Sequence, residues 1–311
     1  MTGEPKVRTV LGDIDPAELG VTDSHDHLFF ASKLLPGQEL DDPTAATELL
    51  LAFKLAGGAA LVQWTPYGLG RRTRELAWMS DELGVHVVAA TGLHRAEHYA
   101  PPVLGRVVDD LVRVFVDDLT EGTQPADLPD EPRTGPRAGL VKVAGAFHTI
   151  DAHARLTLTA AAVAHQETGA PIAVHLELGT AALEVAELLC EKLEVPPDRV
   201  ILGHLNRNPD LRSLREIADV GTFLGFDGPS RANHATDWLL FDGLEALVDA
   251  GHGGRILLGG DTTTAAARFQ PGAPYLLTTL APRLTKLLGG DVVTAMLVAN
   301  PARAFATSWL E

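Results

Sequence analysis

The chain has 311 residues, 46% of them hydrophobic, and a formal net charge of −16. An acidic surface disfavours nucleic acids and anionic membranes as partners, because both attract basic proteins. The sequence has no run of 18 apolar residues and no apolar signal segment near its start, so no membrane span or secretion signal is expected. The single cysteine, Cys190, allows no internal disulfide and indicates a cytoplasmic protein.

Short apolar segments alternate with helical segments along the chain. Eight apolar segments are predicted β-strands, at residues 20–28, 59–66, 86–94, 138–145, 171–178, 199–206, 222–228 and 255–262. Helical patterns lie between them, for example at 71–84, 155–169 and 181–194. Eight βα units are typical of a (β/α)8 TIM barrel, which needs roughly 250 residues. We therefore expect one barrel domain over residues 1–311.

A doubly wound open sheet is the structural alternative. Such a sheet more often carries a glycine-rich phosphate loop after its first strand, and the segment SHDHLFFAS is not one. Between the third and fourth strands, a helix is predicted near residues 104–119, followed by a polar, proline-rich loop at 120–139. Because the strand pattern resumes directly afterwards, this loop is interpreted as an insertion and not as a domain linker.

Side chains that bind metals follow the apolar part of several predicted strands. His25 and His27 end the first strand, His175 ends the fifth, His204 the sixth and Asp261 the eighth. In a barrel the carboxyl ends of the strands meet at the catalytic face. His25 and His27 are two residues apart in a strand, so both point to the same side. Four histidines and one carboxylate predict a zinc-like metal site.

Lys142 lies in the middle of the apolar fourth strand, GLVKVAG. An unpaired ammonium is costly to bury. One interpretation is that Lys142 points out of the sheet or extends past the strand end to solvent. The other is that its amine reacts with carbon dioxide to give a carbamate, an anion with two oxygens that bridges two cations. Two divalent ions carry four positive charges, and the carbamate, Asp261 and a hydroxide would offset three of them.

These motifs and the segments around them resemble the phosphotriesterase-related branch of the amidohydrolase superfamily. The resemblance covers nearly the whole chain, including TVLGDIDPAELGVTDSHDHLFF, GLVKVAG, VILGHLNRNPDLRSLREIADVGTFLGFDG and ILLGGDTTT. It implies a distorted barrel with a binuclear centre.

The resemblance also implies a role for each residue of the site. His25, His27 and Asp261 would hold the more buried metal, His175 and His204 the more exposed metal, and carboxylated Lys142 and a hydroxide would bridge the two. The expected ions are two divalent metals, zinc or else cobalt, manganese or iron. Lys142 and Asp261 are the expected catalytic residues, with Asp261 as the proton shuttle to the leaving group. Family members are often homodimers.

The substrate contacts are less well defined by the sequence. Lactone-hydrolysing members usually carry a tyrosine where this chain has His94, and an arginine where it has Gly228. His94 is interpreted either as a group that orients a substrate oxygen or as a histidine packed at the barrel rim. Arg95, Arg231 and Arg268 fall in predicted loops above the site and are candidate contacts for an anionic small-molecule substrate.

The sequence thus predicts a binuclear hydrolase that acts on a lactone or another carboxylic ester, with phosphotriester hydrolysis as a side activity. Amide hydrolysis, as in an N-acyl deacylase, would use the same metal site. A mononuclear deaminase would not need Lys142, and the acidic composition disfavours a metal-dependent nuclease. A non-catalytic binding protein on a barrel scaffold would be expected to lack one or more ligands, and every ligand position is filled.

Overall fold

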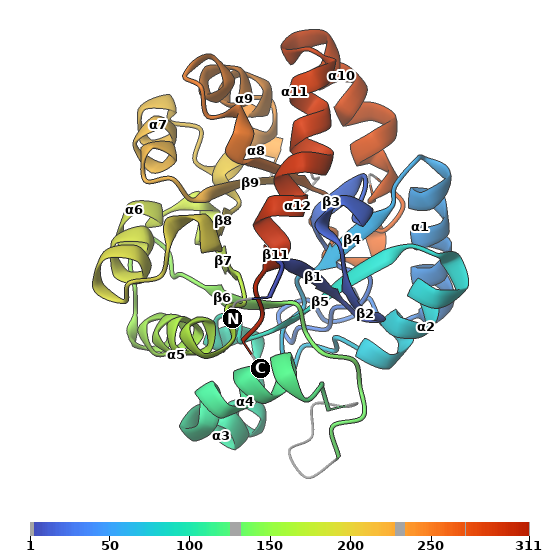
Figure 1. Cartoon of the computed structure of the whole chain (residues 1–311), viewed down its shortest axis with the longest axis vertical. Helices are drawn as coiled ribbons and strands as arrows, with labels where there is room; N and C mark the ends of the chain where they lie inside the picture. Colours follow the sequence, from blue (N-terminus) through green and yellow to red (C-terminus); the bar gives the residue numbers. More distant parts are fainter. Residues whose placement is uncertain (1–2, 125–131, 228–233, 271, 311) are drawn as a thin grey trace.

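The central sheet of the molecule contains eight parallel strands in chain order, curved into a nearly closed barrel (Figure 1). The computed structural model describes residues 3–124, 132–227, 234–270 and 272–310. The barrel strands are β3 (Thr22–Asp26), β4 (Ala60–Gln63), β5 (His86–Thr91), β6 (Leu140–Ala144), β7 (Ile172–His175), β8 (Val200–Gly203), β9 (Phe223–Asp227) and β10 (Ile256–Gly259). Each lies inside a predicted segment, and the TIM-barrel prediction is confirmed.

Helices surround the barrel in Figure 1. They are α1 (Pro43–Leu55), α2 (Thr73–Leu83), α3 (Pro101–Val107), α4 (Leu111–Thr120), α5 (Ala152–Thr168), α6 (Ala182–Ala186), α7 (Leu211–Asp219), α8 (His234–Asp237), α9 (Leu240–Asp249), α10 (Ala281–Leu288), α11 (Gly290–Thr294) and α12 (Asn300–Phe305). The helix predicted near residues 104–119 is divided into α3 and α4. None of the helices in the described ranges is both long enough and apolar enough to cross a membrane.

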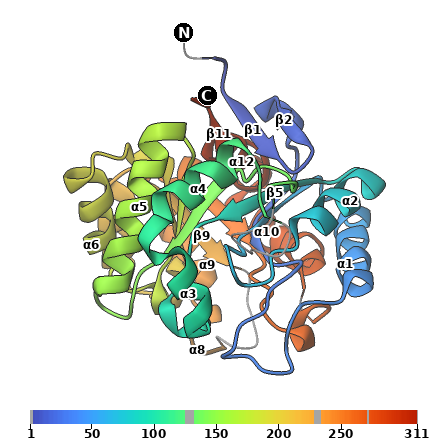
Figure 2. The ribbon, with the colours of Figure 1, turned by 90° about the horizontal axis from the view of Figure 1, so that it is seen from below.

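A small antiparallel sheet, which the sequence pattern did not predict, lies at one end of the barrel. It joins β1 (Lys6–Thr9) to β2 (Gly12–Ile14) and to β11 (Ala306–Thr307), so both ends of the chain meet there (Figure 2). Arg8 is buried in this sheet, and its guanidinium donates hydrogen bonds to the carboxylate of Asp13. Its Cζ lies 3.9 Å from the ring centroid of Trp309. These contacts cover the end of the barrel at which the strands begin.

The barrel closes where the loop after β10 meets β3. The N–H groups of Gly260 and Asp261 both donate to the carbonyl of His25, each at 2.9 Å. The Thr262 N–H donates to the Asp26 carboxylate at 2.8 Å. Because these bonds join the first and last barrel strands, they place Asp261 beside His25.

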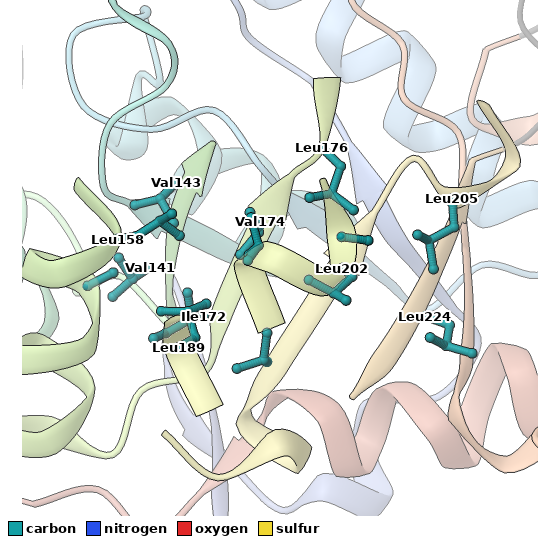
Figure 3. Close-up of a cluster of buried hydrophobic side chains, with 14 of the residues drawn as sticks. Val141, Val143, Leu158, Ile172, Val174, Leu176, Leu189, Leu202, Leu205 and Leu224 are labelled. Atoms are coloured by element: carbon teal, nitrogen blue, oxygen red, sulfur yellow. The ribbon is translucent and has the colours of Figure 1, made fainter. Parts of the chain in front are cut away.

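Alternating residues of β6 face opposite sides of the sheet, as the strand geometry requires. Val141 and Val143 pack outwards with Leu158 of α5 (Figure 3), while Leu140 belongs to the cluster inside the barrel. Lys142 has the same parity as Leu140 and is only 2% exposed. The interpretation in which Lys142 reaches solvent is therefore wrong: the side chain points into the barrel.

Gly92, directly after β5, permits a close approach of two strands. Its φ is +107°, and a Cβ added there would lie 2.0 Å from the carbonyl oxygen of Lys142. Gly57 has nearly the same φ, +101°, but no atom lies within 4 Å of its added Cβ. Alanine substitutions at the two glycines can therefore separate the cost of backbone strain from the cost of a steric clash.

We expect Gly92→Ala to lower the free energy of unfolding by at least about 2 kcal/mol more than Gly57→Ala, because only the former forces the strands apart. Gly57→Ala should cost roughly 1–2 kcal/mol from the left-handed backbone alone. Urea denaturation of both variants measures the difference. Equal losses would show that the approach of Gly92 to Lys142 is not sterically limiting.

Candidate metal centre

A cavity of about 270 Å³ opens at the carboxyl ends of the barrel strands. Five of the six predicted metal ligands line it: His25, His27, Lys142, His175 and Asp261. The sixth, His204, is buried directly behind, with its Nε2 2.7 Å from Nδ1 of His175. The structure thus brings all six predicted ligands to one place.

Two of these residues have a strained backbone. His204 has φ +62° and Asp261 has φ +49°, in the left-handed region that residues other than glycine rarely adopt. Such strain costs of order 1–3 kcal/mol and is concentrated at functional sites. Here it turns both side chains inwards immediately after β8 and β10.

The inward-facing atoms lie within a few ångströms of one another. The Oδ1 atom of Asp261 is 3.3 Å from Nε2 of His25 and 3.6 Å from Nε2 of His27. His25, His204 and Asp261 offer ligand atoms that are all within 4.8 Å of each other, and all three are buried. A buried group of this composition suits a borderline metal such as zinc.

Asp227, the last residue of β9, holds two of the histidines from the outside. Its Oδ1 lies 2.8 Å from Nδ1 of His25, and its Oδ2 accepts a hydrogen bond from Nδ1 of His204. Both rings consequently present Nε2 to the site. A metal-binding histidine commonly has its second ring nitrogen fixed in this way by a carboxylate or carbonyl.

The other two histidines are held by different partners. Nδ1 of His27 is 2.7 Å from the hydroxyl of Thr65, which leaves Nε2 facing inwards. His175 has the opposite arrangement, since its Nε2 is 3.1 Å from Oε2 of Glu177 and its Nδ1 faces His204. Glu177 in turn forms an ion pair with Arg95. All four inward nitrogens are therefore set by contacts outside the centre.

Burial controls the charges of these groups. Removal from water lowers the pKa of His27, His175 and His204, so these rings are neutral and able to act as ligands. Burial alone would raise the pKa of Asp261, but His204, His25 and Arg207 keep it well below its ordinary value. The centre therefore combines neutral imidazoles with an ionised carboxylate.

Lys142 also loses its charge through burial. Its pKa falls from 10.5 to about 7, and the nearby Asp261 offsets only part of the effect. The free amine, and not the ammonium, is the form that reacts with carbon dioxide. Lys142 thus has the protonation behaviour that a carbamate would require.

His94 and His98 form the wall of the cavity next to His175. The His94 ring centroid is 4.1 Å from that of His98 and 4.5 Å from that of His175. The hydroxyl of Ser32 is 2.9 Å from Nδ1 of His98. Burial lowers the pKa of His98 to about 4, so its ring is neutral near pH 7. The sequence pattern does not predict a site role for His98.

The three predicted substrate arginines have different positions. Arg95 lines the cavity, but its guanidinium pairs with Glu97 and Glu177. Arg268 is 3% exposed and donates to the carbonyls of Leu28 and Asp42, so the structure does not bring it into the cavity wall. Arg231 lies outside the described residues, as does Gly228.

Arg207 is a site residue that sequence reasoning missed. It lines the cavity, and its guanidinium forms an ion pair with the carboxylate of Asp261. Asp227 and Glu177 were missed as well. A signal existed for Asp227, because it follows an apolar strand in the same way as the ligands do. Glu177 and Arg207 lie in short turns after β7 and β8, where the sequence pattern gives no such signal.

The lowered pKa of Lys142 predicts a dependence of stability on pH. Between about pH 7 and pH 10.5 the unfolded state binds a proton on Lys142 that the folded state does not, so raising the pH stabilises the folded protein. Below about pH 7 both states are protonated, and the full cost of the buried ammonium remains. In metal-free buffer without carbon dioxide, Lys142→Met should be more stable than the wild type at pH 7.

The advantage of Lys142→Met should shrink by about 4 kcal/mol between pH 7 and pH 10, at roughly 1.4 kcal/mol per pKa unit. Denaturant unfolding of both proteins across this range measures the gap. Titrating groups that do not interact with Lys142 cancel in the comparison, and burial lowers the pKa of the neighbouring His94, His98 and His175 away from this range. A gap that stays constant with pH would contradict the lowered pKa.

Comparisons with known proteins agree with this geometry. A phospho-furanose lactonase of Mycoplasmopsis synoviae (strain 53) is 32% identical over 325 residues, covering 96% of this chain and 91% of its own. An N-acetyltaurine hydrolase of Mus musculus is 25% identical over 344 residues, covering 95% and 96%. A solved lactonase from Listeria monocytogenes superposes with a TM-score of 0.86 at 28% identity, covering 96% of this chain and 98% of that chain. A family model described as the phosphotriesterase family matches residues 5–305, and the chain is a hydrolase that belongs to that family.

Proposed function

We propose that the protein is a binuclear metal-dependent lactonase that opens a small, phosphorylated sugar lactone. The observation that carries the proposal is a set of four histidines, of which His25, His27 and His204 are buried and His175 is half-buried. Each has one ring nitrogen within 3.1 Å of a neighbouring side chain and the other directed to the centre. Metal-binding histidines commonly have their second ring nitrogen held in this way.

The residues present fit two divalent ions. His25, His27 and Asp261 would hold the buried ion, His175 and His204 the exposed ion, and carboxylated Lys142 would bridge them. When bound, two such ions lower the pKa of a shared water and polarise the substrate carbonyl. Zinc suits this mixture of nitrogen and oxygen donors.

The protein's own residues do the remaining chemistry. Asp261 is ionised and projects into the cavity, so it can take the proton of the attacking water and deliver it to the leaving ring oxygen. In that reaction a bond forms between water oxygen and the carbonyl carbon, and the ring ester bond breaks. Arg207 holds the second oxygen of Asp261 and so positions it. We infer that Arg95 fixes the position of the Glu177 carboxylate, which in turn orients the ring of His175.

The size of the cavity favours a compact substrate. Its volume of about 270 Å³ is just below the usual range of ligand pockets, about 300 to 1,000 Å³. His94 lines it and is the candidate to orient a substrate oxygen. The relative named as a phospho-furanose lactonase supports a phosphorylated five-membered sugar lactone as the substrate class.

Two further proposals concern the cellular compartment and the domain organisation. Burial raises the pKa of Cys190 to about 11, so this thiol is unreactive and fits a protein of the reducing cytoplasm. The family match over residues 5–305 supports a single domain.

Amide hydrolysis is the second candidate function. The relative named as an N-acetyltaurine hydrolase shares nearly the whole length of the chain, and an amide carbonyl can be attacked by the same centre. The lactone is preferred because the more similar relative and the superposed structure are both lactonases.

The role of Lys142 can be tested by removing its amine. We expect Lys142→Ala to bind fewer than two ions per chain and to lose nearly all activity, because the bridging anion is missing. Acetate or propionate should restore part of the activity by occupying the gap. Elemental analysis and turnover are the measurements, with the exposed Lys286→Ala as control. Two bound ions and normal turnover in Lys142→Ala would show that Lys142 is structural.

The substrate class can be tested with a panel assayed on the metal-loaded enzyme. A phosphorylated furanose lactone should give a higher kcat/KM than its unphosphorylated counterpart, a long-chain acyl-homoserine lactone or N-acetyltaurine. Asp261→Asn should lose every activity of the panel, which excludes a contaminating hydrolase. Preference for N-acetyltaurine would favour the amide function, and fast turnover of the long-chain lactone would contradict the compact pocket.

A further inference from the structure

A second and larger cavity lies at the end of the barrel opposite to the catalytic centre. Its volume is about 670 Å³. Its lining includes Phe223 at the start of β9, Arg255 just before β10, and residues of α12 and the terminal strand β11. Both chain ends lie on the same side of the barrel as β11 (Figure 2). None of the six predicted metal ligands lines it.

Arginines dominate the charge of this cavity. Arg199, Arg255 and Arg303 line it together with a single carboxylate, Asp198. Three positive charges and one negative charge leave a local charge of +2, in a chain whose formal net charge is −16. His165 also lines the cavity, but burial lowers its pKa, so it adds no charge near pH 7.

Two of the arginines are anchored by the protein. Arg199 donates to the carbonyl of Ala306 and pairs with Asp198 at 3.1 Å. Arg303 donates to the carbonyl of Gly254 and to the side chain of Asn300. These bonds hold both guanidinium groups in fixed positions beside the cavity.

Arg255 differs from the other two. Within the described ranges, its guanidinium has no hydrogen bond and no ion pair. The guanidinium of Arg255 contacts the ring of Phe223. The centroid of this ring lies 5.8 Å from Cζ of Arg255 and also 5.8 Å from Cζ of Arg303. The Phe223 ring therefore lies near two guanidinium groups on the cavity wall, and Arg255 keeps its donors free for a ligand.

We propose that this cavity binds a small phosphorylated organic molecule. The planar fork of an arginine matches phosphate oxygens and forms paired, charge-assisted hydrogen bonds with them. A phosphate monoester carries close to two negative charges near pH 7, which matches the local charge of +2. Phe223 and Ala302, which also line the cavity, provide apolar surface for the organic part.

The location of the cavity indicates that a bound ligand would stabilise the folded protein. The ligand would connect Arg199, Arg255 and Arg303, which come from three segments far apart in the sequence, below the barrel floor. Binding to the folded state alone raises stability by mass action. We therefore expect phenyl phosphate to raise the melting temperature in a way that depends on this cavity.

The experiment is calorimetric titration of the metal-loaded protein, residues 1–311, with phenyl phosphate, supported by melting curves. Arg255→Gln should weaken one binding event about tenfold or more, while Arg215→Gln, an exposed arginine of α7 outside both cavities, should leave it unchanged. Lactone turnover should be the same in both variants. Asp261→Asn, which alters the catalytic centre, should keep this binding event.

Several results would overturn the proposal. One is the absence of any binding event that depends on Arg255, and another is an equal loss of binding in Arg215→Gln. A third is loss of the binding event in Asp261→Asn, which would place the phosphate in the catalytic centre. If Arg255→Gln does not fold, Arg255→Lys keeps the charge without the fork and should still weaken binding. Unchanged binding in a folded Arg255→Lys would equally contradict a site built on the guanidinium.

Discussion

The carboxylate of Asp227 is the contact on which the catalytic end of the barrel depends. Its two oxygens meet Nδ1 of His25 on β3 and Nδ1 of His204 after β8, so one side chain of β9 sets two rings. Asp227 is 2% exposed, and this burial alone would raise its pKa. The two histidines reverse that tendency and keep Asp227 ionised, so its carboxylate favours a proton on Nδ1 of His204 and leaves Nε2 of that ring facing inwards.

The floor below the centre completes this arrangement. Trp64 is 1% exposed, and its ring stacks on His25 with centroids 3.8 Å apart. Its indole N–H donates to the carbonyl of Ser24, so the ring cannot rotate away. Trp64 thus shields His25 from bulk solvent on this side, and the weak dielectric screening of a buried site strengthens the contact of His25 with Asp227. Lys142 is buried as well, and its burial lowers its pKa.

The parts of the fold that follow from repeated patterns could be predicted from sequence. Apolar strands with polar ends gave the barrel and brought His25, His27, His175, His204 and Asp261 together, because parallel strands place their carboxyl ends on one face. The terminal sheet could not be predicted in this way. Its strands have four, three and two residues, too few to show an alternating pattern, and β11 pairs with a strand 300 residues earlier.

Loop residues were the least predictable part of the site. Arg268 is a cation in a loop after β10, and sequence alone does not show that two backbone carbonyls already occupy its guanidinium. His98 had no strand-end position, yet the turn after β5 returns it to the cavity beside His94. The partners of a side chain depend on how a loop folds back, and neither periodicity nor spacing contains that information.

The charges around the proposed centre indicate where a phosphorylated substrate would be recognised. Glu97, Glu177, Asp227 and Asp261 contribute four negative charges, and Arg95 and Arg207, which pair with members of that group, contribute two positive ones. A carbamate on Lys142 brings the sum to −3, so two divalent ions would leave +1, and deprotonation of the shared water would leave zero.

With two ions and a carbamate bound as proposed, these groups would carry no excess positive charge for a phosphate. The cations that bind it must then come from the loops above the cavity. Arg268 donates to backbone carbonyls, so Lys33, exposed in the loop after β3, is the candidate cation among the described loop residues. Residues at the strand ends would thus carry out the reaction, while residues in these loops would select the substrate. The reaction and the substrate preference can therefore change independently.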